Sequence, residues 1–258
     1  MYPKFCMLYY LENIELTECK TCGHSRYKPR TGRGKTLVTH KKLRYISITP
    51  RLQRLFMPPK TTEHMTWHQS HDMVDGVMVH PSRNKAWKHF NNVHPHFSAE
   101  SRNVNLGLCT DGFNPFGSFV APYSCWPIIL TVYNLPLRMC MRLKFMFLST
   151  VMPGPNSLGL NINVCLRPLI DELMQLWSSR VLTYDVSKKQ NFLMKTALMW
   201  TINDFPAYGM ISGWSTYEKL ACLYCMENNK AFTLTNIKRL FFTIASISCQ
   251  RITRTERT

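Results

Sequence analysis

Acidic residues are scarce in this sequence. Of its 258 residues only 15 are Asp or Glu, against 32 Lys or Arg, so the formal net charge is +17 at pH 7. This excess is larger than solubility requires. Two explanations fit it: a solvated basic surface, or a surface that binds a polyanion, of which nucleic acid is the commonest.

Long hydrophobic runs are also missing. No stretch of 18 apolar residues occurs, and Leu240–Cys249 is too short and too rich in Ser and Thr to cross a bilayer. The first residues, MYPKFCMLYYLENIE, lack the layout of a signal peptide. We therefore expect no membrane contact and a reducing compartment, in which the ten cysteines are thiols or metal ligands and not disulfides.

The positive charge is concentrated near the start of the chain. Cys19–Lys60 contains twelve Lys or Arg and no acid, interleaved with Tyr27, Tyr45 and Phe56. Such a composition is typical of segments that follow a phosphate backbone, and it favours a polyanion over a merely solvated surface. The cations that we expect to contact DNA are Arg26, Lys28, Arg30, Arg33, Lys35, Lys41, Lys42 and Arg44.

Two CxxC pairs could each supply half of a zinc site. The spacing in Cys19-Lys-Thr-Cys22 and Cys222-Leu-Tyr-Cys225 lets both thiolates of a turn reach one tetrahedral ion. The first pair has Cys6 and His24 nearby as further ligands, whereas the second has no close His. Zinc and unliganded thiols remain alternatives at both pairs. Four other cysteines lie in apolar surroundings and are interpreted as small core residues: Cys109, Cys125, Cys140 and Cys165.

Three histidines at helical spacing, His64, His68 and His71, raise the alternative of a metal-binding helix face. No carboxylate or thiol is placed to complete such a site. Trp67 and Met65 in the same stretch have the character of packing residues, so packing is the preferred interpretation.

A change of pattern after residue 102 predicts a sheet. The runs VNLGLCT, YSCWPIILTVYN and KFMFLSTVM, separated by Pro, Gly or Asn turns, predict three consecutive strands. An amphipathic helix is expected in VCLRPLIDELMQLWSSRV, a hairpin in VLTYDVSKKQNFLMK, and a last strand, buried on both faces, in TALMWTIND. The predicted fold class is α/β, with a mixed sheet and flanking helices.

An aspartate stands at the end of the first and of the last predicted strand. Asp111 follows Leu-Cys-Thr and Asp204 follows Thr-Ile-Asn, each before aromatic, Pro and Gly residues. Two acids brought together would repel unless a divalent cation lay between them, and oxygen ligands suit Mg²⁺ or Mn²⁺. The alternative is that each Asp caps the turn that follows it, a frequent use of Asp before Gly or Pro.

The chain from Cys6 to Cys225 resembles the transposases of plant CACTA (En/Spm-type) DNA transposons. Ten segments in the family's order carry this resemblance: CMLYY, CKTCGHSRYK, RLQRLFMPPKTTEHMTWH, DGVMVHPSRNKAWKHF, NVNLGLCTDGFNPFG, PYSCWPIILTVYNLP, FMFLSTVMPGPNSLG, LRPLIDELMQLW, LMWTINDFPAYG and GWSTYEKLACLYC.

The resemblance implies a ribonuclease-H-like sheet in which the first and last predicted strands are neighbours. It implies a core that cuts and joins DNA at transposon ends with a metal-bound Asp, Asp, Glu set, Asp111 and Asp204 being the first two acids. The implied partners are transposon-end DNA and other transposon-encoded proteins or a second copy of the chain. The implied location is the nucleus.

The third acid of such a set is not found by resemblance. After Asp204 the sequence offers only Glu218, Glu227 and Glu256, and none stands where the family places its catalytic glutamate. We therefore expect a truncated, catalytically incomplete member, with a non-catalytic DNA-binding or transposase-interacting remnant and a pseudogene product as alternatives.

The expected organisation has four parts. Residues 1–60 form a basic arm with a zinc-knuckle, 61–102 a His- and Trp-rich connection, 103–225 an incomplete ribonuclease-H-like core, and 226–258 an unrelated or divergent tail. The start is expected to be clipped, because Tyr2 stands where the family has another cysteine and an upstream DNA-binding segment is not present.

Overall fold

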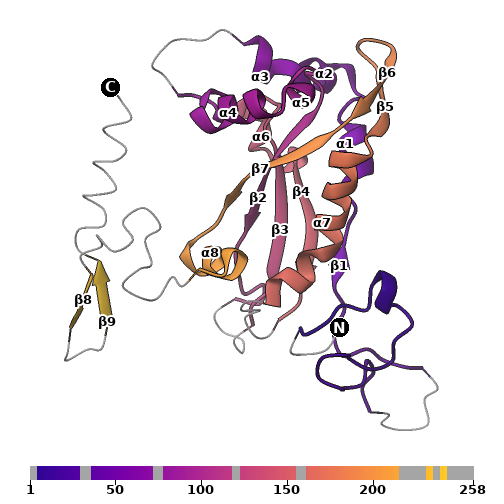
Figure 1. Cartoon of the computed structure of the whole chain (residues 1–258), viewed down its shortest axis with the longest axis vertical. Helices are drawn as coiled ribbons and strands as arrows, with labels where there is room; N and C mark the ends of the chain where they lie inside the picture. Colours follow the sequence, from indigo (N-terminus) through magenta and orange to yellow (C-terminus); the bar gives the residue numbers. More distant parts are fainter. Residues whose placement is uncertain are drawn as a thin grey trace. The chain divides into compact units, whose positions relative to one another are not determined.

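The computed structural model divides the chain into two units, residues 1–202 and residues 203–258. It describes residues 5–29, 36–71, 78–117, 123–154, 161–214, 231–234 and 239–242. Figure 1 labels the elements along the chain.

The described part of the first unit contains seven strands and most of the helices of the chain. Its strands are β1 (Arg44–Tyr45), β2 (Val104–Thr110), β3 (Trp126–Val132), β4 (Met146–Met152), β5 (Val181–Asp185), β6 (Gln190–Met194) and β7 (Thr196–Ile202). Its α-helices are α1 (Thr49–Arg54), α2 (Pro59–Thr62), α3 (Trp67–Ser70), α4 (Lys85–Val93), α5 (Pro95–Ser98), α6 (Leu137–Cys140) and α7 (Ile162–Ser178). Short 3-10 helices are η1 (Leu11–Asn13), η2 (Glu63–Thr66), η3 (Pro81–Arg83) and η4 (Leu143–Phe145).

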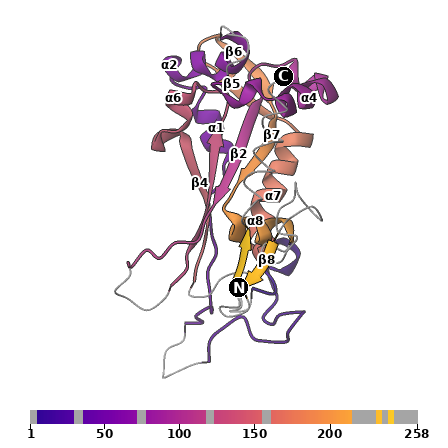
Figure 2. The same cartoon turned by 90° about the vertical axis from the view of Figure 1, so that its left-hand side faces the viewer.

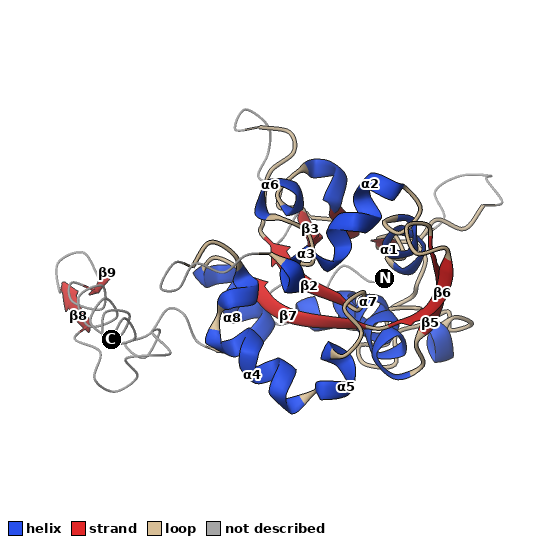
Figure 3. Ribbon diagram, turned by 90° about the horizontal axis from the view of Figure 1, so that it is seen from above, coloured by secondary structure: helices blue, strands red, loops and turns tan. Residues whose placement is uncertain are grey.

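A five-stranded mixed sheet forms the centre of this unit, in the order β1-β4-β3-β2-β7. The strands β2, β3 and β4 form an antiparallel meander, whereas β7 pairs with β2 in parallel. Figure 3 shows β7 beside β2 at the border of the sheet. The α/β class and the mixed sheet with flanking helices are therefore confirmed. The three predicted strands, the helix, the hairpin β5–β6 and the last strand are all present.

The core of the sheet follows from strand alternation. In β2 the side chains of Val104, Leu106 and Leu108 are buried on one face. The amphipathic helix α7 packs against β4 and β7 and buries Leu166 and Leu169 among other residues. Apolar side chains at period 2 in a strand and near 3.6 in a helix produce these two complementary surfaces.

Strand β7 departs from the prediction of burial on both faces. Its first residues are buried, but Leu198 is 39% exposed and Ile202 is 55% exposed. β7 stands at the end of the strand order in the described residues, so its side chains have neighbours from an adjacent strand on one side only and are less covered on each face than those of a central strand. A near-continuous apolar run predicts strand formation, but it does not report what covers the strand.

Two polar side chains, Glu172, which is partly buried, and Asn134, connect segments before β2 to later elements of the fold. The carboxylate of Glu172 on α7 accepts hydrogen bonds from the hydroxyls of Tyr45 and Ser47 and from the backbone amides of Ile48 and Thr49, at the start of α1. Burial raises the pKa of Glu172, but hydrogen bonds from Ser47, Thr49 and Tyr45 outweigh burial and lower it overall.

Asn134, fully buried, makes the second connection. Its side-chain oxygen accepts from the Asn105 amide at 2.8 Å, and its amide group donates to the carbonyls of Met65 and Asn103 at 3.1 and 2.8 Å. It therefore joins the His- and Trp-rich segment to the start of β2.

The β5–β6 hairpin, labelled in Figure 2, is tied to the rest of the unit by an ion pair and by aromatic contacts. Asp185, 1% exposed, lies 3.3 Å from the guanidinium of Arg102, which also pairs with Glu100. The ring of Phe192 lies edge-on to Phe56 at 5.0 Å.

The second unit contains α8 (Phe205–Ser212) and the antiparallel pair β8 (Ala231–Leu234) and β9 (Arg239–Phe242). Asp204 is the N-cap of α8, and Gly213, with φ +73°, ends it in the left-handed conformation. Within the described residues, no helix combines the length and apolar character needed to cross a bilayer.

Candidate metal centres

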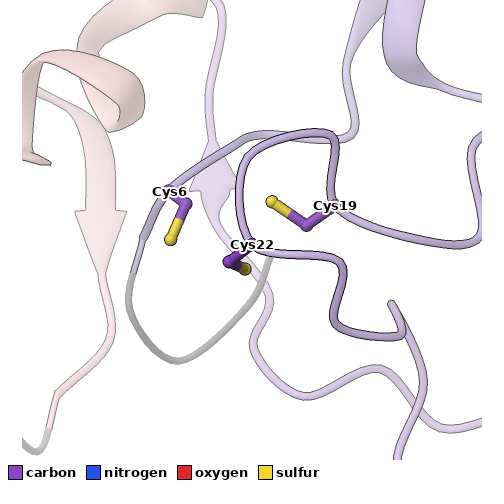
Figure 4. Close-up of side chains that lie close together, drawn as sticks. All are labelled: Cys6, Cys19 and Cys22. Carbon is purple, nitrogen blue, oxygen red and sulfur yellow. The ribbon is translucent and has the colours of Figure 1, made fainter.

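Three cysteine thiols come together in the basic arm (Figure 4). The sulfurs of Cys6, Cys19 and Cys22 all lie within 4.8 Å of one another, the only such group of three or more His, Cys, Asp or Glu ligands in the described part of the chain. A tetrahedral zinc ion with Zn–S bonds of about 2.3 Å places its sulfurs about 3.8 Å apart, so the three thiols would move slightly closer together on binding the ion. The donor set therefore fits zinc, with three of four ligands supplied.

The local backbone explains why the CxxC pair forms a turn. The amide of Gly23 donates to the Cys19 carbonyl at 2.8 Å, and the amide of Cys19 donates to the His24 carbonyl at 2.9 Å. Gly23 has φ +68°, a conformation that favours glycine. The turn is thus closed by its own backbone, and both thiols project from it.

The pKa shifts of two thiols oppose each other. Burial raises the pKa of Cys19, but hydrogen bonds from Cys22 and Thr21 outweigh burial and lower it overall. Burial, followed by the neighbouring Cys22 thiol, raises the pKa of Cys6. Backbone amides directed at a sulfur favour the thiolate, which is the form that binds zinc.

His24 is not brought into this group. Its ring Nδ1 lies 3.1 Å from the carbonyl oxygen of Cys22. The described residues therefore supply Cys6, Cys19 and Cys22 as one ligand set without His24. The second pair, Cys222 and Cys225, lies outside the described residues.

The thiol cluster belongs to a small core that shapes the arm. Met7, Tyr9 and Cys19 are buried together, with Cys6, Leu16 and Cys22 packed against them. Short antiparallel pairings follow the turn, joining Glu18 to Ser25 and Tyr27 to Thr39. A metal ion would add to a core that is otherwise only a few side chains in size.

The expected DNA-contacting cations of the arm differ in their surroundings. Lys28, Lys42 and Arg44 are exposed. Arg26 donates to the carbonyls of Ile14 and Leu16 and lies 4.8 Å from the Tyr9 ring centroid, so it also holds the arm together.

Lys41 lies 4.0 Å from the centroid of the Phe5 ring, and burial lowers its pKa. Arg30, Arg33 and Lys35 lie outside the described residues.

His68, His71 and His80 act as packing residues. His68 is 6% exposed and His71 stacks on Trp67 at 3.9 Å. Burial lowers the pKa of His68 and of His80 to about 4 in each case, so both rings are neutral near pH 7. The interpretation of this stretch as packing is confirmed.

Asp111 directly follows β2 and is exposed to solvent. The turn after it is organised by a different side chain. Asn114 accepts from the Phe116 amide at 3.0 Å and donates to the Gly117 carbonyl at 2.9 Å. Capping of this turn therefore belongs to Asn114, a residue that the sequence analysis did not single out although Asn before a turn is a recognised signal.

Asp204 is exposed and does act as a cap. Its Oδ1 accepts the Ala207 amide at 2.9 Å. One carboxylate oxygen is therefore used by the helix start. This confirms the capping alternative for Asp204, and it is compatible with a metal ligand at the other oxygen.

The strands that precede the two acids are neighbours. β2 and β7 run parallel, and the register ends with Cys109 opposite Ile202. The two strands therefore end at the same edge of the sheet. β2 ends one residue before Asp111, and β7 ends two residues before Asp204. Because Asp111 belongs to the first unit and Asp204 to the second, a common cleft for their carboxylates stays a prediction.

Comparison with known proteins adds one finding. Residues 75–253 match the family model described as transposase family tnp2. The match leaves out the Cys-containing arm and extends to residue 253, within the segment 226–258 that was expected to be unrelated or divergent. A search of curated proteins finds no match.

Proposed function

The chain belongs to transposase family tnp2, and from this premise we propose that it acts in cutting and joining DNA at transposon ends, with Asp111 and Asp204 as ligands of the divalent metal. The closer relationship that we propose is to transposases of the CACTA type. DNA is the proposed partner and the nucleus the proposed location.

The parallel pairing of β2 and β7 carries this proposal. Ladder positions Leu106 to Cys109 on β2 lie opposite Leu198 to Ile202 on β7, with one irregularity after Leu106. A strand order of β4-β3-β2-β7, with the meander antiparallel and β7 parallel to β2, supports a ribonuclease-H-like assignment, in which the first and second acids follow neighbouring strands. Acids at such ends suit Mg²⁺ or Mn²⁺.

The metal would activate a water or a 3′-hydroxyl for in-line attack on a phosphodiester. The protein itself would position the reacting groups and neutralise the charge of the DNA. Asp204 accepts a hydrogen bond from the Ala207 amide, which orients it, and Asp111 directly follows the buried strand β2. Exposed cations would hold the DNA backbone while these acids face the scissile phosphate.

We further propose that this chain alone does not cleave DNA. Of the glutamates after Asp204, Glu218 is only 14 residues downstream and Glu227 stands two residues after Cys225. A two-acid centre leaves more water ligands on the ions and holds them more loosely, while phosphoryl transfer depends on their fixed placement.

A second candidate function is DNA binding without catalysis. The observation that favours it is the exposure of Lys28, Lys42 and Arg44 on an arm that has a small core of its own. Under this alternative the acids would be structural, and the arm would supply the activity.

The test combines metal binding with strand cleavage. Mn²⁺ titration calorimetry should show a weak site in the wild type that is lost in Asp111→Asn and in Asp204→Asn. A nicking assay on transposon-end DNA with Mg²⁺ or Mn²⁺ should show no cleavage by any of the three proteins.

If the wild type cleaves DNA and both substitutions abolish cleavage, the proposed metal centre at Asp111 and Asp204 would be supported. The proposal that this chain alone does not cleave DNA would then be wrong. Equal Mn²⁺ binding in all three proteins would reject the metal centre itself. Asp171→Asn is the matched control, since that carboxylate pairs only with Arg167 on the surface of α7 in the described contacts.

A further inference from the structure

A cavity of about 400 Å³ opens beside β7 within the first unit. Its lining includes Val79 and Asn84, before α4, Tyr133, directly after β3, and Trp200 and Ile202 on β7. We propose that this cavity receives one unstacked nucleobase of the bound DNA, with Trp200 and Tyr133 as its aromatic contacts. The proposal rests on the proposed function only in taking DNA as the ligand.

A glycine makes the aromatic floor of the cavity possible. Trp200 pairs with Gly107 across the β2–β7 ladder. A Cβ at Gly107 would lie 2.4 Å from the Tyr133 ring, so that ring lies directly over the glycine. The Tyr133 and Trp200 centroids are 5.8 Å apart at 73°, an edge-to-face pair. Tyr133, which is 5% exposed, therefore holds the Trp200 ring in a fixed geometry, and Trp200 offers the more accessible face.

Trp200 is supported from behind and remains partly accessible. The ring of Trp87, which is 2% exposed, lies 5.7 Å from it. Trp200 itself is only partly buried. An indole that is held by its neighbours and still reaches a cavity can stack on a base without first losing side-chain freedom.

Polar groups at the cavity suit the edge of a base. Asn84 uses its Oδ1 to accept the Ala86 amide at 2.8 Å, and its amide NH₂ is a donor for ring nitrogens and carbonyls. Thr201, exposed on β7, adds a hydroxyl that can donate or accept. A purely apolar ligand would leave these groups unused.

The charge around the cavity favours a polyanion over a peptide or an apolar partner. Residues 78–99, which form one wall and α4, include Lys85 and Lys88 and no Asp or Glu. Lys88 is four residues after Asn84, the N-cap of α4, and its backbone amide donates to the Asn84 carbonyl, so it lies on the same side of the helix, and Lys88 is exposed. It stands one helical turn from the cavity, where the phosphate of an inserted nucleotide would need a cation.

The experiment compares two DNA probes in EDTA. One is a duplex with a three-nucleotide 3′ overhang that carries 2-aminopurine, and the other is the blunt duplex. Trp200→Ala should bind the overhang about tenfold more weakly, with no change for the blunt duplex and none in the salt dependence. Wild type should quench 2-aminopurine fluorescence, and Trp200→Ala should not.

Three further variants make the result specific. Trp200→Phe should restore overhang binding, because it keeps an aromatic face, whereas Leu198→Ala, an exposed apolar change on the same strand, should resemble wild type. Lys88→Gln should weaken binding to both probes and reduce the salt slope by about one.

Equal binding of both probes by wild type, or the same loss in Leu198→Ala as in Trp200→Ala, would overturn the base site. If Trp200→Ala does not fold, the comparison of wild type with Trp200→Leu decides by quenching, since Leu fills space without stacking. EDTA removes metal chemistry, so failure of the Asp111 and Asp204 centre leaves this result unaffected. A wild type that binds neither probe would overturn the base site and DNA binding together.

Discussion

At the scale of single residues, the Asp185–Arg102 ion pair shows most clearly how burial determines the contribution of one interaction to stability. Asp185 accepts three further hydrogen bonds, from the Ser187 amide and hydroxyl and from the Lys188 amide. Burial raises its pKa, but the hydrogen bonds, with Ser187 first, lower it overall. A charge in this position is costly to leave without its partner.

Replacing Asp185 with Asn should destabilise the protein by about 3 kcal/mol, because Arg102 would remain buried with Glu100 as its only acidic partner among the described residues. The measurement is the urea unfolding midpoint. Asp171→Asn is the control: its pair with Arg167, whose side chain is 55% exposed, should change stability far less, because solvent screens an exposed pair. Equal effects from the two substitutions would contradict this account.

The buried histidines make stability depend on pH. The pKa of His68 is lowered to about 4, mainly by burial and then by His80, so the folded state takes up no proton there between the ordinary value near 6.5 and pH 4. The unfolded chain does take one up in that window. Stability should therefore fall as pH decreases from 6.5 to 4, by about 3 kcal/mol for His68 if the shift is fully expressed.

The measurement is chemical unfolding at pH 7.5, 6, 5 and 4.5. His68→Met should flatten the decline, whereas the control His96→Asn should not, because His96 is exposed. A decline of the same steepness in His68→Met and wild type would assign the pH dependence to other groups.

At the scale of elements, the arm depends on a few side chains and on the thiol cluster. If Cys6, Cys19 and Cys22 bind zinc, Cys19→Ser should lower the zinc content of purified protein and increase proteolysis between residues 5 and 29, because the small core would lose its ion. Plasma emission spectroscopy and limited proteolysis measure the two effects.

Cys140→Ser is the control for this substitution. Its thiol is buried outside the cluster and donates to the Leu137 carbonyl, a bond that a hydroxyl can make. If purified wild-type protein contains no zinc, or if Cys19→Ser and wild type contain equal amounts of zinc, then Cys6, Cys19 and Cys22 do not form a zinc site.

At the scale of the whole molecule, the question is whether the arm supplies the affinity for DNA. Replacing Lys28, Lys42 and Arg44 by Gln should reduce the slope of log affinity against log salt by about 2 to 3, since fewer counterions would be released. Filter binding to a blunt duplex between 50 and 200 mM salt measures this slope.

A control triple variant, Arg180→Gln with Lys188→Gln and Lys189→Gln, removes the same charge from exposed positions on and just before the β5–β6 hairpin. It should lower the slope much less. The same reduction in both triple variants would mean that affinity follows net charge and not the arm.

Local pattern was sufficient for most elements and for one cluster of ligands. The strand at Val104–Thr110 and the hairpin from Val181 to Met194 follow from side-chain alternation and turn residues, which act over a few positions. The CxxC spacing predicts that Cys19 and Cys22 share a turn, because four residues can close it. The excess of Lys and Arg points to a polyanion whatever the fold.

Tertiary packing decided what no local pattern reports. That β7 lies at the border of the sheet, that Glu172 caps a helix from another part of the chain, and that Gly107 makes room for Tyr133 beside Trp200 all depend on contacts between distant residues. Such contacts depend on how the layers of the fold pack against each other. That packing is encoded by many residues of the sequence together and not by any short segment of it. The sequence therefore determined the elements and their chemistry, and the fold decided which of them meet.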